Sequence, residues 1–291
     1  MASLRELRRK VKSVKSTQQI TKAMKLVAAA RLNRAQEKII AARPFAAKLE
    51  QLLQELAYIE LHNDTPETKL DHPFLKERTG KRIDLVMVTA DRGLCGGFNA
   101  NLMRRGLQFI RENSDSDIHL WLIGKKGRDF FRRFKMNIEN EYINIFQRLS
   151  YTQAEVIGKD LIDAFLKTQT RSITILYNEF KSRIQQKLTL KQLLPITEMP
   201  ETKPEIDFIY EPDQKGIVEE LMPRFVKAQI YRVLLESQSA ELAARMAAMD
   251  SATKNAKELI GSLTLTMNKV RQAAITKEIS EIVGGAEALQ N

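Results

Sequence analysis

Several residue types are scarce in this sequence of 291 residues, and each scarcity argues against a class of protein. Cys95 is the only cysteine, so no disulfide can form within the chain, which suits a reducing compartment. No apolar run approaches the roughly 20 residues that a membrane-spanning helix needs. The basic stretch Met1–Lys12 is not followed by an apolar segment, so we expect no secretory signal. The three histidines, His62, His72 and His119, lack the spacing of zinc ligands.

Catalytic and nucleotide-binding motifs are also missing. The loop 91–99 follows an expected strand and precedes an expected helix, which is where phosphate-binding glycines lie. However, Gly93, Gly96 and Gly97 fit neither the dinucleotide fingerprint nor the P-loop. Segment 124–127 (GKKG) could hold an anion, but solvated lysines at the start of a helix explain it more simply. With no nucleophile–base set and no paired carboxylates, we predict no catalytic, cofactor-binding or metal-binding residue.

The sequence does contain an uneven distribution of positive charge. The net charge is +11, and residues 1–58 carry 13 Lys and Arg against 4 Asp and Glu. Residues 59–212 carry 24 against 22, and residues 213–291 carry 10 of each. We therefore expect an acidic partner for the first segment, such as nucleic acid, anionic lipid or an acidic protein surface.

The first segment has the composition of one long helix. Residues 3–58 contain no glycine, and Pro44 is their only proline; we expect it to kink the helix without ending it. At 1.5 Å per residue the helix would be roughly 80 Å long. Steps of three and four residues mark a stripe that is apolar at both ends and polar in the middle: Leu4, Leu7, Val11, Val14, Gln18, Thr21, Lys25, Ala28, Leu32, Ala35, Ile39 and Ala42. Beside the polar stretch runs an apolar stripe, Ile20, Met24 and Val27, and we expect it to take over the helix contact there.

The last segment carries a cleaner stripe. Its nine steps alternate between 4 and 3, and Thr253 is its only polar member: Leu242, Met246, Met249, Thr253, Ala256, Ile260, Leu263, Met267, Val270 and Ala274. Consecutive heptads with mixed charges outside the stripe indicate a coiled coil.

The middle segment alternates strand-like and helix-like stretches. Arg82–Ala90 is a near-continuous apolar run, typical of a buried strand. Further strands are expected at 118–123, 136–145, 172–178, 184–190 and 206–210, and helices at 100–112, 126–134 and 153–168. The predicted fold class is therefore α/β, with a Rossmann-like domain inserted between N- and C-terminal helices that pair as a long antiparallel coiled coil. The predicted segments are 1–58, 59–212 and 213–291.

The C-terminal helix is expected to extend beyond the N-terminal helix by about 20 residues, or roughly 30 Å. This projecting piece, Ala273–Leu289, contains Ile275, Ile279, Ile282, Val283 and Leu289. A lone helix that exposes so much apolar surface is a liability in water, so we expect it to have a socket in a partner.

Several segments resemble the gamma-subunit family of F-type ATP synthases, in the family's own order. Residues 268–274 (NKVRQAA) and 275–289 (ITKEISEIVGGAEAL) are similar to its C-terminal signature. Residues 20–29 (ITKAMKLVAA) resemble its N-terminal helix, 91–99 (DRGLCGGFN) a loop of its central domain, and 210–213 (YEPD) the return into its second helix. The resemblance spans essentially the whole chain. The cysteine-bearing insert of chloroplast-type members is missing, so thiol regulation of that kind is not implied.

The resemblance implies a non-catalytic central-stalk rotor subunit of a proton-translocating ATP synthase. Such a subunit couples rotation of the membrane c ring to conformational cycling of the catalytic beta subunits, and it regulates ATPase activity and proton flow. The implied partners are the alpha, beta, epsilon and c-ring subunits, without a cofactor or nucleic acid. The implied location is peripheral, on the cytoplasmic face of the bacterial inner membrane, which the chain reaches only through the c ring.

Matching the family's motifs position by position also implies individual contacts. Those with the beta subunits fall on Lys22, Met24, Lys25, Arg245, Arg271, Gln272, Thr276 and Glu278. Those with the c ring and epsilon fall on Phe208, Tyr210 and Glu211. Simpler interpretations remain open at this stage: Met24 can equally be coiled-coil core, and Lys22 and Lys25 can be solvated charges.

Two alternatives come from other functional classes. A nucleic-acid-binding protein could use the basic N-terminal helix, although residues 1–43 contain no aromatic side chain to stack on bases. Its mark would be salt-sensitive duplex binding. A nucleotide-dependent enzyme could use the central domain, although that domain lacks a phosphate motif. Its mark would be a thermal shift on adding nucleotide.

Overall fold

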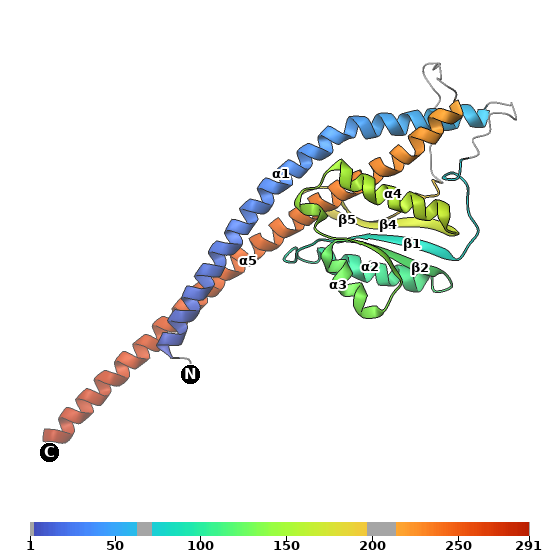
Figure 1. Ribbon diagram of the computed structural model, residues 1–291. Coiled ribbons are helices and arrows are strands. Elements are labelled where there is room, and N and C mark those ends of the chain that lie inside the picture. Colours follow the sequence, from blue (N-terminus) through green and yellow to red (C-terminus); the bar gives the residue numbers. More distant parts are fainter. Residues whose placement is uncertain (1–2, 63–71, 197–213, 291) are drawn as a thin grey trace. The chain divides into compact units, whose positions relative to one another are not determined.

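A computed structural model describes residues 3–62, 72–196 and 214–290 of the chain (Figure 1). Two very long helices, α1 (Leu4–His62) and α5 (Gln214–Gln290), enclose an α/β region in the sequence. The chain forms two compact units, and both long helices contribute to each. Residues 1–29 with 245–291 are called the shaft unit, and residues 30–244 the sheet unit. The expected strand at 206–210 lies outside the described residues.

The sheet unit is built on a five-stranded, mostly parallel sheet of order β3-β2-β1-β4-β5. Four strands run parallel, and the last pairs antiparallel with β4. The strands are β1 (Arg82–Val88), β2 (Asp117–Ile123), β3 (Ile138–Tyr142), β4 (Thr170–Phe180) and β5 (Gln186–Leu194). The predicted α/β class is thus confirmed, because strands alternate with the helices α2 (Phe98–Glu112), α3 (Lys125–Phe131) and α4 (Tyr151–Lys167).

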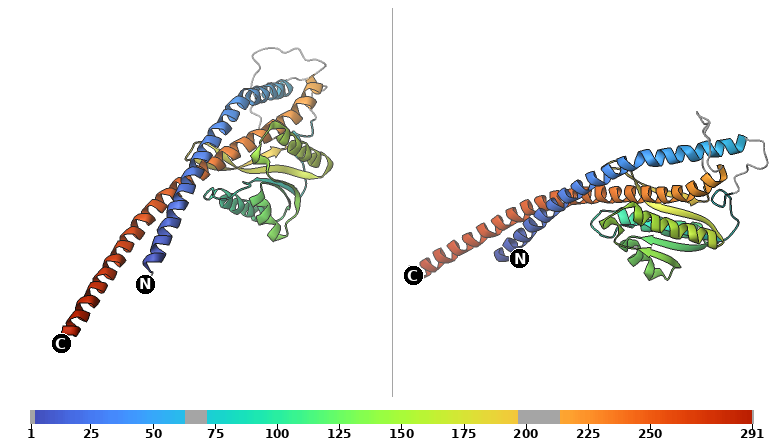
Figure 2. Two further views of the ribbon diagram at one scale, coloured as in Figure 1. Left: turned by 60° about the vertical axis from the view of Figure 1, so that its left-hand side comes forward. Right: turned by 45° about the horizontal axis from the view of Figure 1, so that its top comes forward.

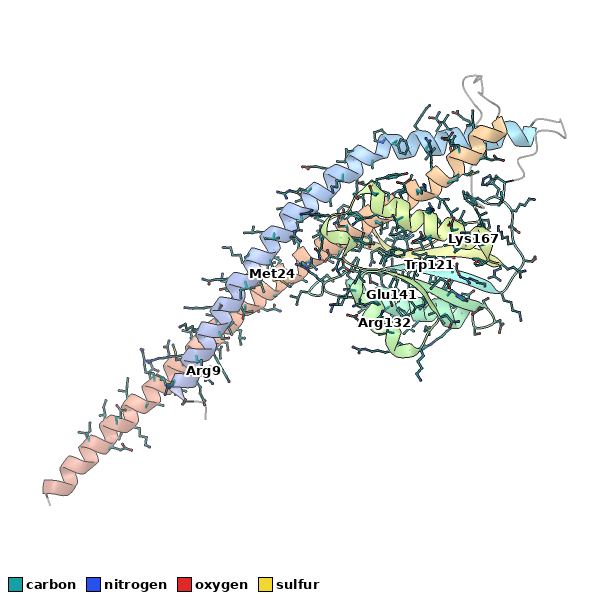
Figure 3. All side chains as sticks on the ribbon, in the orientation of Figure 1. Arg9, Met24, Trp121, Arg132, Glu141 and Lys167 are labelled. Carbon is teal, nitrogen blue, oxygen red and sulfur yellow. The ribbon has the colours of Figure 1, made fainter. Side chains whose placement is uncertain are left out.

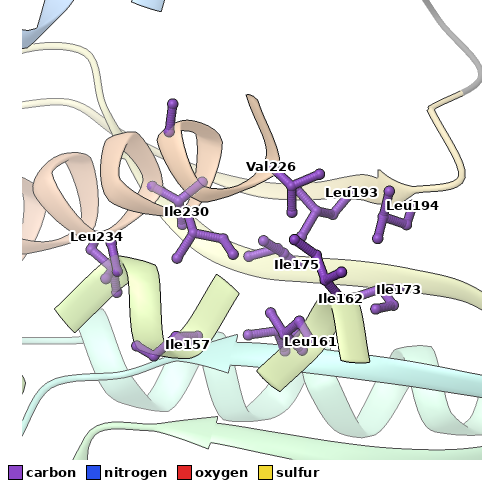
Figure 4. Close-up of a cluster of buried hydrophobic side chains, with 14 of the residues drawn as sticks. Ile157, Leu161, Ile162, Ile173, Ile175, Leu193, Leu194, Val226, Ile230 and Leu234 are labelled. Carbon is purple, nitrogen blue, oxygen red and sulfur yellow. The ribbon is translucent and has the colours of Figure 1, made fainter. Parts of the chain in front are cut away.

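Helices cover both faces of the sheet, as the views in Figure 2 show. The odd-numbered positions of β1, such as Leu85 and Met87, pack on α2 and α3. The even-numbered positions, such as Val86 and Val88, belong to the opposite core with α4 and α5. Figure 4 shows this second core, where Ile157 and Leu161 of α4 face the side chains of β4 and α5. Burial on both faces explains why β1 is apolar at almost every position.

Helix α1 continues without a break through Pro44. Within the sheet unit it packs on α5 through Leu32, Ala35, Leu242 and Ala243, all of them buried. Farther along, Leu49 and Leu53 join the core that contains α4 and α5. Leu32, Ala35 and Leu242 belong to the predicted stripes, whereas Leu49, Leu53 and Ala243 do not; together they hold the second half of α1 by apolar packing.

Candidate functional site: the helical shaft and its exposed faces

The shaft unit is an antiparallel pair of helices. The Thr21 and Thr253 hydroxyl oxygens lie 2.8 Å apart, and Lys25 Nζ lies 2.6 Å from Asp250 Oδ1. Residue numbers rise along α1 as they fall along α5, which sets both the direction and the register. Counting outward from Thr21 and Thr253 in steps of three and four places Val14 level with Ile260 and Leu7 level with Met267.

Burial follows the stripes predicted from the sequence, except that the last α5 position, Ala274, is exposed. In the shaft unit, every α1 stripe position from Leu4 to Ala28 is buried or half-buried, and so is every α5 stripe position from Met246 to Val270. From Arg271 to Gly285 every side chain is exposed. Burial on α5 therefore ends level with the first turn of α1, and Figure 2 shows α5 running on past the start of α1.

The expected change of stripe in the middle of α1 is wrong. Ile20 and Val27 are 57% and 53% exposed and Met24 is half-buried, whereas Thr21 and Ala28 are buried. The contact stays on the polar positions because two of them find partners across the seam: Thr21 bonds to Thr253, and Lys25 bonds to Asp250. Burying a polar group costs the folded protein little stability when the group has a hydrogen-bond partner, and much more when it has none.

The predicted beta-contact residues fall on different parts of the shaft unit. Lys22 is exposed, and Met24, labelled in Figure 3, is half-buried, as is Arg245 on α5. Lys25 forms an ion pair with Asp250. The pKa of Asp250 is lowered by the hydrogen bond from Lys25 and by a second one from Lys254. The four predicted residues of the projecting helix are all exposed: Arg271, Gln272, Thr276 and Glu278.

The projecting end of α5 carries an apolar face, and none of the described residues of the chain packs against it. Ile275, Ile279, Ile282 and Val283 are exposed by 48%, 56%, 71% and 52%. Their spacing of three and four residues places them along one side of the helix. The predicted c-ring and epsilon contacts, Phe208, Tyr210 and Glu211, lie outside the described residues.

Sequence reasoning missed Asp250 as a seam residue. It follows the stripe position Met249 and has the charge opposite to that of Lys25. Opposite charges at facing seam positions were a usable signal, but only once the register was known.

The glycine loop of the sheet unit is tied down by its own chain. Asp91 Oδ1 accepts hydrogen bonds from the backbone N–H of Lys125 at 3.1 Å and of Asn144 at 2.9 Å. Asn99 Oδ1 accepts one from the N–H of Ala90 at 2.9 Å. At the other candidate anion site, segment 124–127, the Asp91 carboxylate occupies the start of α3, where a bound anion would need the same N–H group of Lys125. The loop 91–99 is thus tied to the chain that follows β1, β2 and β3.

A charge cluster at one end of the sheet joins β1, through an ion pair of Arg82 with Glu139 at 3.3 Å, to β2 and β3. His119 Nε2 lies 2.9 Å from Asp117 Oδ2, and His119 Nδ1 lies 2.9 Å from Glu139 Oε2. Ionised carboxylates only accept hydrogen bonds, so this arrangement favours the protonated ring, in which both nitrogens donate. Burial lowers the pKa of His119, but the bonds to Asp117 and Glu139 outweigh it and leave the pKa raised. Within the described residues, no group of three or more His, Cys, Asp or Glu side chains is placed to bind a metal.

The sheet unit also contains a groove of about 960 Å³ between α1, α4 and α5. Its apolar part includes Ile39, Ala42 and Leu235, beside an edge-to-face pair of tyrosines. Its three cations each have an acidic partner within the chain: Arg224 with Glu220, Lys227 with Glu155, and Arg232 with Glu236. Across the described residues, no helix is long and apolar enough to span a membrane.

Comparison with known proteins identifies the family of this chain. The family model described as ATP synthase matches residues 3–289. The ATP synthase gamma chain of Desulforamulus reducens is 46% identical over 292 residues, covering all of both chains. The gamma chain of Desulfitobacterium hafniense is 45% identical over 290 residues, again covering all of both chains. The chain belongs to the ATP synthase gamma-chain family.

Solved ATP synthases share the fold of this gamma-family chain. A chain of the Euglena gracilis mitochondrial enzyme, from a structure of its OSCP, F1 and c ring, has a TM-score of 0.68 at 20% identity, covering 98% of this chain and 94% of its own. A chain of the Tetrahymena thermophila central stalk and c ring has a TM-score of 0.61 at 24% identity, covering 80% and 99%. Family membership makes the chain a non-catalytic stalk subunit of an ATP synthase, and nothing in the comparisons supports nucleic-acid binding.

Proposed function

We propose that this gamma-family chain is the rotating central shaft that joins the membrane c ring of an ATP synthase to its catalytic beta subunits. The observation that carries the proposal is the shaft unit itself. Two antiparallel helices form a seam that ends at Val270, and α5 continues alone with an exposed apolar side. A ring of alpha and beta subunits supplies the socket that this side needs.

The proposed mechanism is conformational coupling. A shaft with different side chains on different sides contacts each beta subunit differently as it turns, and a ligand shifts a bistable protein only through such differential contacts. We assign the beta contacts to Lys22, Met24 and Arg245 around the helix pair, and to Arg271, Gln272, Thr276 and Glu278 on the single helix. Lys25 acts there mainly by holding Asp250.

The remaining partners follow from the family. We propose that Phe208, Tyr210 and Glu211 contact the c ring and epsilon. The proposed location is the cytoplasmic face of the bacterial inner membrane, which the chain reaches through the c ring. The basic excess of residues 1–58 then faces an acidic surface of the beta subunits.

The test is co-purification of the tagged full-length chain with alpha and beta subunits from its own organism, followed by reconstitution into vesicles. We expect a stable complex that pumps protons when given ATP, and no ATPase activity from the purified chain alone. Failure to recover the alpha and beta subunits would refute the proposal. ATP turnover by the purified chain alone would also refute it, if that turnover is lost when the chain is mutated.

A further inference from the structure

The middle of α1 offers two faces for the seam of the shaft unit. One face carries Thr21, Lys25 and Ala28; the other carries Ile20, Met24 and Val27, each one residue earlier. Neighbouring residues of a helix lie about 100° apart around its axis, so turning α1 by that angle would exchange the two faces. Apolar burial drives helix pairing in water. By that criterion alone, Ile20 and Val27 belong in the seam, yet both are more than half exposed.

Two polar contacts distinguish the rotation that the structure adopts. The Thr21 and Thr253 hydroxyls lie 2.8 Å apart, and Lys25 Nζ lies 2.6 Å from Asp250 Oδ1. The second carboxylate oxygen of Asp250, Oδ2, lies 3.1 Å from Nζ of Lys254 on its own helix. The alternative rotation would carry Thr21 and Lys25 away from their partners and leave polar groups of α5 facing isoleucine and valine.

We propose that Thr21, Lys25, Asp250 and Thr253 form a rotational lock for α1. The lock leaves Ile20 and Val27 out of the seam, which reduces apolar burial there, and it selects one of the two competing rotations of α1. Single polar residues at core positions fix the register of coiled coils in the same way. Its consequence is that Ile20 and Val27 point outward along the shaft. The rotation is a property of the chain alone, so its test needs no partner subunit.

Thiol labelling of the full-length chain can report the rotation. The native Cys95 is only 2% exposed, so it contributes little background. Val27→Cys and Ala28→Cys, made separately, place a thiol on a position that is 53% exposed and on one that is 2% exposed. The first should react faster by roughly tenfold or more, because the second reacts only when the helices open locally.

The lock is then broken by Lys25→Glu, which sets a like charge opposite Asp250 and alters no apolar residue. We expect the ratio of the two rates to fall by roughly threefold to tenfold, with Ala28→Cys reacting faster and Val27→Cys slower. Exchanging the charges, with Lys25→Asp and Asp250→Lys together, should restore the parent ratio. Lys22→Glu, an exposed lysine one turn earlier, is the matched control and should leave the ratio unchanged.

Three results would overturn the proposal. An unchanged ratio in Lys25→Glu would show that the ion pair does not select the rotation. A rise in both rates together would mean that the pair only holds the helices closed. Failure of the charge exchange to restore the ratio would show that the effect does not depend on the pairing between the two sites.

Discussion

Substitutions on the exposed apolar side of the projecting helix can separate an effect on folding of the free chain from an effect on assembly with the alpha and beta subunits. In the double variant Ile279→Ser with Ile282→Ser, isoleucine and serine have similar helix propensities, so the helix itself should be little affected. The side chains are 56% and 71% exposed, so the free chain gains little from them. Its free energy of unfolding should change by less than about 0.5 kcal/mol, as for other surface changes.

In the complex, the same two side chains lose their exposed surface to the socket. Burying an isoleucine fully is worth about 1.5–3 kcal/mol, and here the 56% of Ile279 and the 71% of Ile282 that are exposed remain to be buried. Together they should contribute about 2–4 kcal/mol, which corresponds to a loss of roughly 30-fold to several hundred-fold in the association constant.

The assay is competition between variant and parent chains for limiting alpha and beta subunits, with the melting of each free chain measured in parallel. Lys277→Gln with Glu281→Gln is the matched control, since it removes an exposed ion pair from the same turns and leaves the apolar side intact. If the free chain loses as much stability as the complex, the isoleucines serve the fold and the socket argument is wrong. Equal competition by variant and parent would refute it as well.

Three further predictions concern the two units. Ile260→Asp with Leu263→Asp places carboxylates in the seam, so ATP-driven proton pumping by the reconstituted complex should fall much further than ATP hydrolysis; equal losses would contradict the seam assignment. Because the pKa of His119 is raised in the folded chain, its stabilising contribution should be complete below about pH 6.5 and be lost as pH rises through the raised value. Urea midpoints from pH 6 to 9 should show this decline in the parent and not in His119→Asn. Gly124→Ala should cost about 2 kcal/mol or more in urea unfolding, because φ is +96° there and an added Cβ would overlap the backbone carbonyl of Thr89; a cost below about 0.5 kcal/mol would contradict this.

The sequence was sufficient to predict an element of the fold wherever one kind of interaction determined it. The strand β1 could be predicted because both of its faces are buried, so its apolar run has no competing interpretation. The α5 stripe could be predicted because its apolar residues recur every seven positions, as Ile260 does with Met267 and Leu263 with Val270. The helix at residues 153–168 was expected two residues late, because its first residues gain their helical conformation from the capping box at Ser150.

Prediction failed where two interactions competed. Apolar content favoured Ile20 and Val27 for the seam, but a scale of single-residue hydrophobicity contains no information on pairing. The preference of Lys25 for the seam depends on Asp250, which lies 225 residues away, and only the register brings the two together. The contacts assigned to the beta subunits have a similar limit, since a side chain that serves a partner leaves no mark on its own chain beyond exposure.

The end of the seam at Val270 also has a mechanical consequence. Up to that point a twisting force is shared by two helices that brace each other through interlocked side chains. Beyond it, the same force falls on a single rod, whose resistance to bending and twisting is much smaller. A load applied to the tip of α5 will therefore bend or twist this single helix before it deforms the helix pair.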